Sequence, residues 1–206
     1  MTLRLALLSE LTEHQDATIS DRLMRLLGVE RPRIAYLASQ PDPYRVYFEQ
    51  ARSCYKHLGA DLAVYLDSET VPGGGGSGSL IGCDAVHLSG GNTYSFSTWL
   101  SGAGLFQCLR QFAADGGALI GVSAGAILIT PCIDTASLCG DVADRAGGHE
   151  TLGLVPFGFL PHWVPGQRLP AGALSHPIYA CTDGAGVIVD GATIEAHGHV
   201  ELLSPK

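Results

Sequence analysis

Residues 118–129 read Ala118-Leu119-Ile120-Gly121-Val122-Ser123-Ala124-Gly125-Ala126-Ile127-Leu128-Ile129. The first five form a short apolar run, which is typical of a strand buried on both faces. The last four are apolar and helix-like. The G-x-S-x-G between the two runs therefore predicts a sharp strand-to-helix turn that exposes the Ser123 hydroxyl above the sheet edge. An ordinary glycine-rich turn is the alternative interpretation of the pentapeptide.

The same alternation of short apolar runs and helix-like stretches continues on the N-terminal side. Strands are predicted at Leu3–Leu8, Arg33–Ala38, Leu62–Leu66, Ala85–Leu88 and Ala118–Val122. Helices are predicted where apolar residues recur at helical spacing, at Asp16–Leu27, Tyr44–Leu58 and Leu105–Ala114. Strand and helix in alternation predict an α/β fold, a three-layer sandwich with a mostly parallel central sheet and helices on both faces.

The last quarter of the chain has a different pattern. Short strand-like pieces at Ile178–Thr182, Gly186–Val189 and Thr193–Glu195 are separated by Asp-Gly turn signals, so they predict an antiparallel edge of the sheet. The glycine-rich run Pro72–Ser79 is interpreted as a surface loop, because the strand pattern continues beyond it. We therefore expect a single domain over residues 1–206.

Composition and charge narrow the classes of function. The chain is 46% hydrophobic, has a formal net charge of −8 and carries 12 Lys plus Arg without a basic run. A nucleic-acid partner is not expected, because phosphate contacts need clustered cations. Membrane insertion is not expected either, because no apolar stretch approaches the roughly 18 residues of a spanning helix. Six scattered cysteines without a C-x-x-C pair favour reduced thiols. These features predict a cytoplasmic monomer or homodimer with a small ligand.

A second glycine motif, Ser89-Gly90-Gly91-Asn92-Thr93, follows the strand predicted at 85–88. Two glycines at the carboxyl end of a strand free their amides for a ligand, and such ends line the binding crevice of open α/β sheets. Gly91 or Asn92 could supply an oxyanion donor beside the N–H of Ala124. The alternative is a glycine turn with Asn92 capping the next helix. The run lacks the spacing of a phosphate loop, and we expect no cofactor.

A serine hydroxyl needs a base to take its proton, so a histidine partner is expected. His162 is the preferred candidate, because it follows the apolar segment 157–160 at a strand end beside the same crevice. His197 and His199 alternate on the terminal strand and could form a metal pair, but no third ligand stands at a recognisable spacing, so no metal is expected. The other histidines are His14, His57, His87, His149 and His176.

The base in turn needs a carboxylate that holds its tautomer and stabilises the imidazolium. Asp183 follows the strand predicted at 178–182 and precedes a glycine, a position from which it can face His162. Asp134 and Asp141, in the stretch after the Ser123 helix, are the alternatives. An aspartate before a glycine is also a common turn residue.

Three segments together resemble the peptidase E family, also called dipeptidase E or alpha-aspartyl dipeptidase. They are Leu88–Thr93, Gly121–Ala126 and Pro161-His162-Trp163, in the order and spacing of that family, and the resemblance spans roughly residues 85–189. The family comprises serine peptidases with a glutamine-amidotransferase-like fold. The resemblance implies Ser123 as nucleophile, His162 as base, an acid near Asp183, and oxyanion donors from Gly90, Gly91 and Ala124.

The chain departs from the family at two places. Many relatives have a glutamate at the position of Asp183, and the shorter aspartate demands a closer backbone. Relatives that cleave Asp-X dipeptides have a basic helix after the histidine, whereas residues 164–170 here contain only Arg168. Arg168 and Asn92 are the expected substrate-binding residues.

The resulting hypothesis is a dipeptidase that acts after an N-terminal aspartate through an acyl-enzyme on Ser123. One alternative is a related amide hydrolase for neutral dipeptides or a cyanophycin-like polymer. Another is a ligand-binding relative without activity, since a fold does not fix a function. The serine at the turn counts against glutamine amidotransferase activity, which uses a cysteine there.

Overall fold

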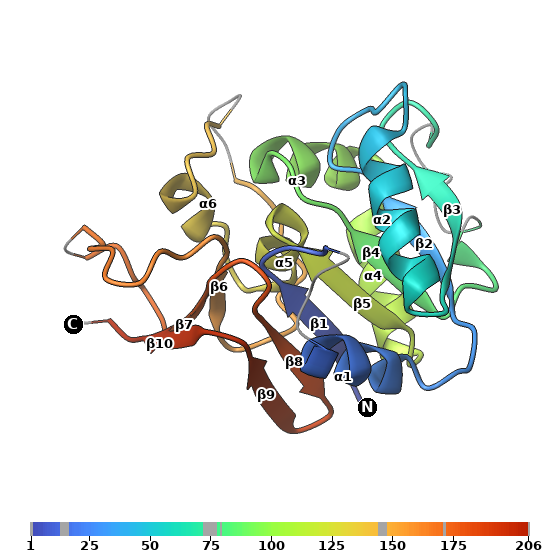
Figure 1. The fold of residues 1–206 in the computed structure, drawn as a ribbon. Helices are drawn as coiled ribbons and strands as arrows, with labels where there is room; N and C mark the ends of the chain where they lie inside the picture. The colour runs from blue at the N-terminus through green and yellow to red at the C-terminus, as the bar shows by residue number, and fades with distance from the viewer. Residues whose placement is uncertain are drawn as a thin grey trace.

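The computed structural model describes residues 2–12, 17–71, 78, 80–143, 148–170 and 172–205. Its centre is a seven-stranded sheet (Figure 1). The strands lie in the order β3 (Asp61–Leu66), β2 (Arg33–Leu37), β4 (Ala85–Leu88), β5 (Ala118–Val122), β1 (Arg4–Leu8), β8 (Gly186–Asp190) and β9 (Thr193–His197). The first five are parallel, and β8 and β9 form an antiparallel edge.

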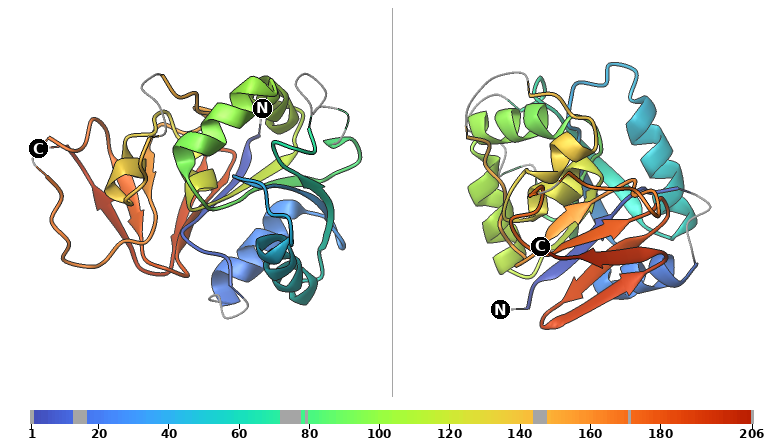
Figure 2. Two further views of the ribbon diagram at one scale, coloured as in Figure 1. Left: turned by 90° about the horizontal axis from the view of Figure 1, so that it is seen from above. Right: turned by 90° about the vertical axis from the view of Figure 1, so that its left-hand side faces the viewer.

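Helices cover both faces of this sheet (Figure 2). On one face, α1 (Ala17–Leu27) and α2 (Val46–His57) pack in an apolar cluster that includes Leu23 and Tyr55. On the other face, α3 (Thr93–Gly102), α4 (Leu105–Ala114) and α5 (Ala124–Ile129) pack in a second cluster that includes Phe96 and Leu128. The predicted α/β sandwich with a mostly parallel sheet is confirmed.

A small second sheet was not predicted. It consists of β6 (Gly158–Leu160), β7 (Ile178–Cys181) and β10 (Val200–Leu203), with β6 and β7 parallel and β10 antiparallel to β7. The prediction that 178–182 belongs to the antiparallel edge of the main sheet is therefore wrong. Ile178 and Ala180 pack instead with Leu160 and Trp163 in a third apolar cluster, so β7 is needed on this side.

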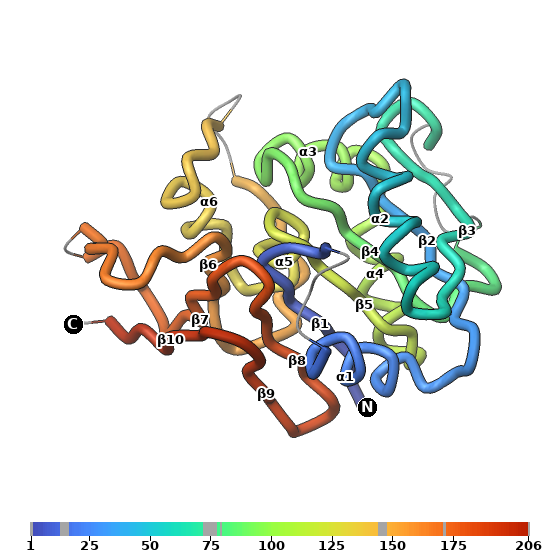
Figure 3. Tube along the Cα trace, in the orientation of Figure 1, coloured from blue at the N-terminus to red at the C-terminus, as the bar shows by residue number. Residues whose placement is uncertain are grey.

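The chain crosses between the two sheets near the end of β1. In Figure 3 the chain runs through β6 and β7 beside the main sheet, joins the main sheet with β8 and β9, and ends with β10 back in the second sheet. The short helix α6 (Thr135–Leu138) lies next to β6. The two sheets lie side by side here. The carboxyl ends of β6 and β7 are therefore close to those of β1 and β5.

Two predictions cannot be compared with the structure. The loop at 72–79 and His14 lie mostly or entirely outside the described residues, since 72–77, 79 and 13–16 are among those left out. Within the described ranges, every helix is too short or too polar to cross a bilayer.

Candidate active site

Ser123 occupies a strained turn between β5 and α5. Its backbone angles are φ 50° and ψ −110°, a conformation that costs a non-glycine residue about 1–3 kcal/mol. Hydrogen bonds fix it from both sides, because the Ser123 N–H donates to Leu8 O at 2.9 Å and the Ser123 carbonyl accepts from the N–H groups of Ala126 and Ile127. The surrounding backbone thus holds the hydroxyl at the carboxyl end of the sheet.

The two glycines of the pentapeptide are required by close backbone approach. A Cβ on Gly125 would lie 2.1 Å from the carbonyl oxygen of Leu88, and one on Gly121 would lie 2.6 Å from the backbone of Ala126. Neither neighbour is a side chain that could rotate away. The G-x-S-x-G pattern therefore reflects the packing of α5 directly onto β4 and β5.

Ser123, His162 and Asp183 form a hydrogen-bonded chain. Ser123 Oγ lies 2.9 Å from His162 Nε2, and His162 Nδ1 lies 2.6 Å from Asp183 Oδ1. The imidazole and carboxylate are partly exposed, with 46% and 59% of their side-chain surfaces accessible. The structure thus brings together the three residues that the sequence singled out, from the ends of β5, β6 and β7.

The short side chain of Asp183 reaches the imidazole because a hydrogen bond holds the backbone after His162 close to the end of β7. The Trp163 N–H donates to Cys181 O at 2.9 Å, which holds the residue after His162 against the end of β7. A turn with Thr182 O accepting from Ala185 N then presents Asp183.

The two alternative acids have other partners. Asp141 Oδ2 accepts from the N–H and the hydroxyl of Thr93, at 2.8 and 2.6 Å, at the start of α3. Asp134 Oδ2 accepts from the Ser175 hydroxyl at 3.2 Å. Neither carboxylate contacts His162 in the part of the chain that the structure describes.

Ser9 forms hydrogen bonds with both His162 and Asp183. It follows β1, is fully buried, and its hydroxyl accepts from the His162 N–H at 2.8 Å while donating to Asp183 Oδ1 at 3.2 Å. The Ser9 N–H in turn donates to Ala185 O at 3.0 Å. His162 has a positive φ of 56°, so this bond also stabilises an uncommon backbone conformation. Sequence reasoning missed Ser9, although its place directly after a buried strand was a usable signal.

The peptide between Gly90 and Gly91 is oriented by two hydroxyls. The Gly90 carbonyl accepts from Ser39 Oγ at 2.6 Å and from Ser89 Oγ at 2.9 Å. Because the C=O and N–H of a trans peptide point in opposite directions, the Gly91 N–H points away from both serines. Gly90 itself lies beside Ser123, since a Cβ built on it would be 3.5 Å from Ser123 Cβ.

Residues 5–199 match the sequence profile of Peptidase family S51. The chain belongs to this family. It is therefore a peptidase, and the resemblance to peptidase E found in the sequence is confirmed.

Curated relatives agree with this assignment. An uncharacterized peptidase, PM1590, from Pasteurella multocida (strain Pm70) is 30% identical over 153 residues, which are 72% of this chain and 73% of the relative. Peptidase E from Streptomyces coelicolor (strain ATCC BAA-471 / A3(2) / M145) is 27% identical over 79% of this chain and 65% of its own length. Peptidase E from Nostoc sp. (strain PCC 7120) is 28% identical over 80% of this chain.

Solved structures share the fold of this S51 chain. A Listeria monocytogenes EGD-e protein described as a candidate peptidase E superposes with a TM-score of 0.75 at 20% identity, covering 99% of this chain and all of the other. A peptidase from an acI-B1 Actinobacterium superposes with a TM-score of 0.71 at 16% identity, covering 98% and 91%.

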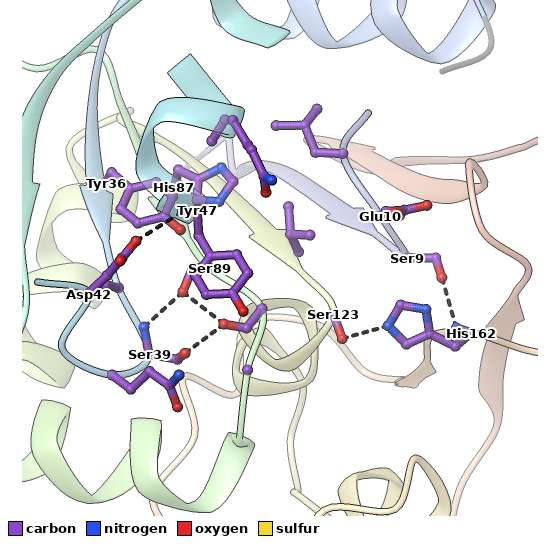
Figure 4. A pocket seen from close by; sticks show the side chains of 18 residues that line it. Ser9, Glu10, Tyr36, Ser39, Asp42, Tyr47, His87, Ser89, Ser123 and His162 are labelled. Atoms are coloured by element: carbon purple, nitrogen blue, oxygen red, sulfur yellow. Dashed lines mark hydrogen bonds between the residues drawn. The ribbon is translucent and has the colours of Figure 1, made fainter. Parts of the chain in front are cut away.

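A cavity of about 430 Å³ opens beside Ser123 in this S51 member (Figure 4). Gly90, Gly91, Ser123 and His162 form one side of it. The rest comes from β2, β4 and β5, from the segments that follow β1, β2 and β4, and from α2. Its lining residues are Ser9, Glu10, Leu11, Tyr36, Ala38, Ser39, Gln40, Asp42, Tyr47, Gln50, Ala51, His87, Ser89 and Val122. A volume of this size suits a small molecule or a short peptide.

The two predicted substrate-binding residues do not line this cavity. The Asn92 side chain accepts from Ser95 N at 2.9 Å and so caps α3, which was the alternative interpretation. Arg168 lines a different cavity of about 820 Å³ over the second sheet, with Trp163 and Leu203. The structure therefore does not bring Arg168 together with Ser123. The physical reason is the second sheet, since the segment after Trp163 packs against β10 and away from the main sheet.

His87 forms the floor of the cavity beside Ser123. It is 3% exposed, its ring stacks on Tyr36 at 4.8 Å between centroids, and its Nδ1 lies 2.8 Å from the Tyr55 hydroxyl. Burial lowers the pKa of His87 from 6.5 to about 3, so the imidazole is neutral at physiological pH. Among the described residues, Tyr55 is the hydrogen-bond partner of this imidazole, through Nδ1, and His87 lines the cavity.

The stability of the protein is expected to fall in acid because of His87. In the unfolded chain this histidine binds a proton below about pH 6.5, whereas in the folded state it does not until about pH 3. Acidification from pH 7 to pH 5 should therefore cost about 2 kcal/mol of unfolding free energy through this group. Urea unfolding of the wild type and of His87→Gln at both pH values measures the difference. An equal pH dependence in the two proteins would contradict the assignment.

No group of three or more His, Cys, Asp or Glu side chains within the described ranges is arranged to hold a metal ion. His197 Nε2 lies 3.4 Å from Glu195 and His199 Nε2 lies 3.4 Å from Glu201, so each terminal-strand histidine has a different carboxylate beside it.

Proposed function

We propose that this S51 peptidase is a serine peptidase that hydrolyses short peptides, foremost dipeptides, through an acyl-enzyme on Ser123. The observation that carries the proposal is the chain from Ser123 Oγ to His162 Nε2 at 2.9 Å and from His162 Nδ1 to Asp183 Oδ1 at 2.6 Å. It has the geometry of a nucleophile, a general base and an orienting acid. The 430 Å³ cavity beside it supports a small substrate.

In the first half-reaction, Ser123 Oγ attacks the carbonyl carbon of the scissile peptide bond and its proton passes to His162 Nε2. The tetrahedral intermediate then collapses, the C–N bond breaks, and the leaving amine takes that proton from His162. In the second half, a water molecule loses a proton to His162 and attacks the ester, which releases the acid and restores Ser123. Asp183 stabilises the imidazolium that forms in both halves.

Two backbone N–H groups are suited to stabilise the oxyanion. Ala124 is the first residue of α5, so its N–H has no acceptor within the helix. The Gly91 N–H is directed away from Ser39 and Ser89 by their bonds to the Gly90 carbonyl. The Gly125 N–H is not available, because it donates to Ser89 O at 3.0 Å.

The cavity beside Ser123 does not favour an N-terminal aspartate in the substrate. A buried substrate carboxylate needs a charge-assisted partner. Arg168, the cation expected to supply it, lines the other cavity.

A fluorophosphonate probe and a panel of dipeptides test the proposed function. The probe is expected to label the wild type and not Ser123→Ala, and the wild type is expected to hydrolyse part of the panel. Peptide hydrolysis that persists in Ser123→Ala would refute the serine mechanism.

Removing the hydroxyl in Ser9→Ala is expected to lower kcat roughly 10-fold to 100-fold with little change in KM. The variant leaves the His162 N–H without its acceptor and leaves Asp183 Oδ1 with His162 Nδ1 as its remaining partner. A hydrogen bond to a charged group contributes about 1.5–3 kcal/mol. Steady-state kinetics with one dipeptide measure the split between kcat and KM. Ser137→Ala is the matched control, since Ser137 is exposed and its hydroxyl donates only to the nearby Asp134 carbonyl. A change confined to KM would contradict the positioning role.

A further inference from the structure

We propose that the residue on the acyl side of the scissile bond is basic, a lysine or arginine, with its α-ammonium group toward Glu10 and its side chain toward Asp42. This inference rests on the proposed function, because it assigns the cavity beside Ser123 to the first residue of a dipeptide. It runs opposite to the aspartate preference expected from the resemblance.

The lining of the cavity is acidic. Glu10 and Asp42 both contribute to it, Glu10 beside Ser9 and Asp42 beside Tyr36 (Figure 4). Glu10 makes no hydrogen bond or ion pair within the described ranges, and the Asp42 carboxylate accepts only the Tyr47 N–H at 2.9 Å. Both groups therefore retain free acceptor capacity for a cationic ligand.

The described lining of the cavity contains no permanent cation beside these carboxylates. None of the described residues that line the cavity is a lysine or arginine, and burial lowers the pKa of the lining His87 to about 3. The nearest arginine in sequence, Arg45, lies over the Tyr65 ring at 4.7 Å and does not line the cavity. With a net charge of −8 on the whole chain, the field at this site attracts a cation and repels a substrate carboxylate.

The cavity is deep between Ser123 and its floor. His87 is paired with Ile120 in the sheet, three residues before Ser123, so the floor lies roughly 10 Å from the nucleophile along the strands. A long side chain fills a cavity of this depth better than a short one. Leu11, Ala51 and Val122 offer apolar surface to its methylenes.

The closing experiment separates binding from turnover. Ser123→Ala is expected to bind a dipeptide without cleaving it, and calorimetry compares Lys-Leu, norleucyl-Leu and Asp-Leu. Norleucine has the four-carbon stem of lysine without its ammonium group. We expect Lys-Leu to bind roughly 10-fold to 100-fold more tightly than norleucyl-Leu, and Asp-Leu to bind most weakly. On the wild type, kcat/KM is expected to follow the same order.

Two further variants in the Ser123→Ala background locate the effect. Asp42→Asn should reduce the preference for Lys-Leu over norleucyl-Leu to about one, since it keeps the acceptor for the Tyr47 N–H and removes the charge. Glu10→Gln should weaken both peptides to a similar degree, because both have an α-ammonium group. Asp61→Asn and Glu30→Gln are the matched controls, as both carboxylates are exposed and outside the cavity.

Tighter binding of Asp-Leu than of Lys-Leu overturns the inference, and so does a lysine preference that Asp42→Asn leaves unchanged. These outcomes would leave the proposed function unchanged. That function fails only if the wild type hydrolyses no peptide or if Ser123→Ala still hydrolyses one.

Discussion

Ser123→Ala and His162→Ala are each expected to lower kcat on the order of 10⁴-fold or more. In the proposed mechanism the Ser123 hydroxyl forms the ester, and the imidazole 2.9 Å away takes its proton. The two residues act as one unit, so the double variant should lose little more than either single variant. Single-turnover kinetics on a dipeptide that the wild type cleaves give the three losses.

The exposed His57 on α2 provides the control for these variants, since His57→Ala removes an imidazole far from the site and should leave kcat near the wild-type value. Losses of the two single variants that add in the double variant would show that Ser123 and His162 act independently.

Asp183→Asn is expected to lower kcat roughly 10²-fold to 10⁴-fold. The amide keeps an acceptor for His162 Nδ1 but removes the negative charge that stabilises the imidazolium, and it can hold the ring in the wrong tautomer. The lower bound reflects the 59% exposure of the Asp183 side chain, because solvent screens the interaction of exposed charges.

Two carboxylates serve as comparisons for Asp183. Asp134→Asn should leave kcat nearly unchanged, since Asp134 contacts Ser175 and not His162. Asp141→Asn should act through the cap of α3, that is, on stability more than on kcat. A larger loss of kcat in either of these variants than in Asp183→Asn would contradict the assignment of the acid.

The main sheet could be predicted because its parallel strands are buried on both faces and appear as apolar runs. The predicted strands at 85–88 and 118–122 have the observed bounds, and the others differ by one or two residues at their ends. The second sheet could not be predicted, because β6 has only three residues, too few to show a pattern, and β10 shows little alternation of apolar and polar residues. Periodicity also does not say which sheet a short strand such as β7 joins.

Some residues of the candidate site could likewise be predicted from the sequence and others could not. The pentapeptide around Ser123 and the histidine at 162 could be selected from sequence because both follow apolar runs. Ser9 also follows an apolar run, but nothing in the sequence says that its hydroxyl meets His162 and Asp183, which are more than 150 residues away. Asp42 could not be selected, because a carboxylate in a cavity looks like an ordinary loop residue in the sequence. Arg168 was expected at the substrate because it is the only arginine after His162 in the sequence, but its position depends on the second sheet.

The central claim is that the acyl group of the substrate passes through Ser123. The most direct measurement is acid quenching of the wild type a few milliseconds to seconds after mixing with an aminoacyl p-nitrophenyl ester, followed by digestion and mass spectrometry. A good leaving group makes acylation faster than deacylation, so the intermediate should accumulate. The account predicts that the peptide containing Ser123 gains the mass of the aminoacyl group and that the gain disappears as the substrate is consumed. Continued turnover with no adduct at any time, or with the adduct on another residue, would contradict it.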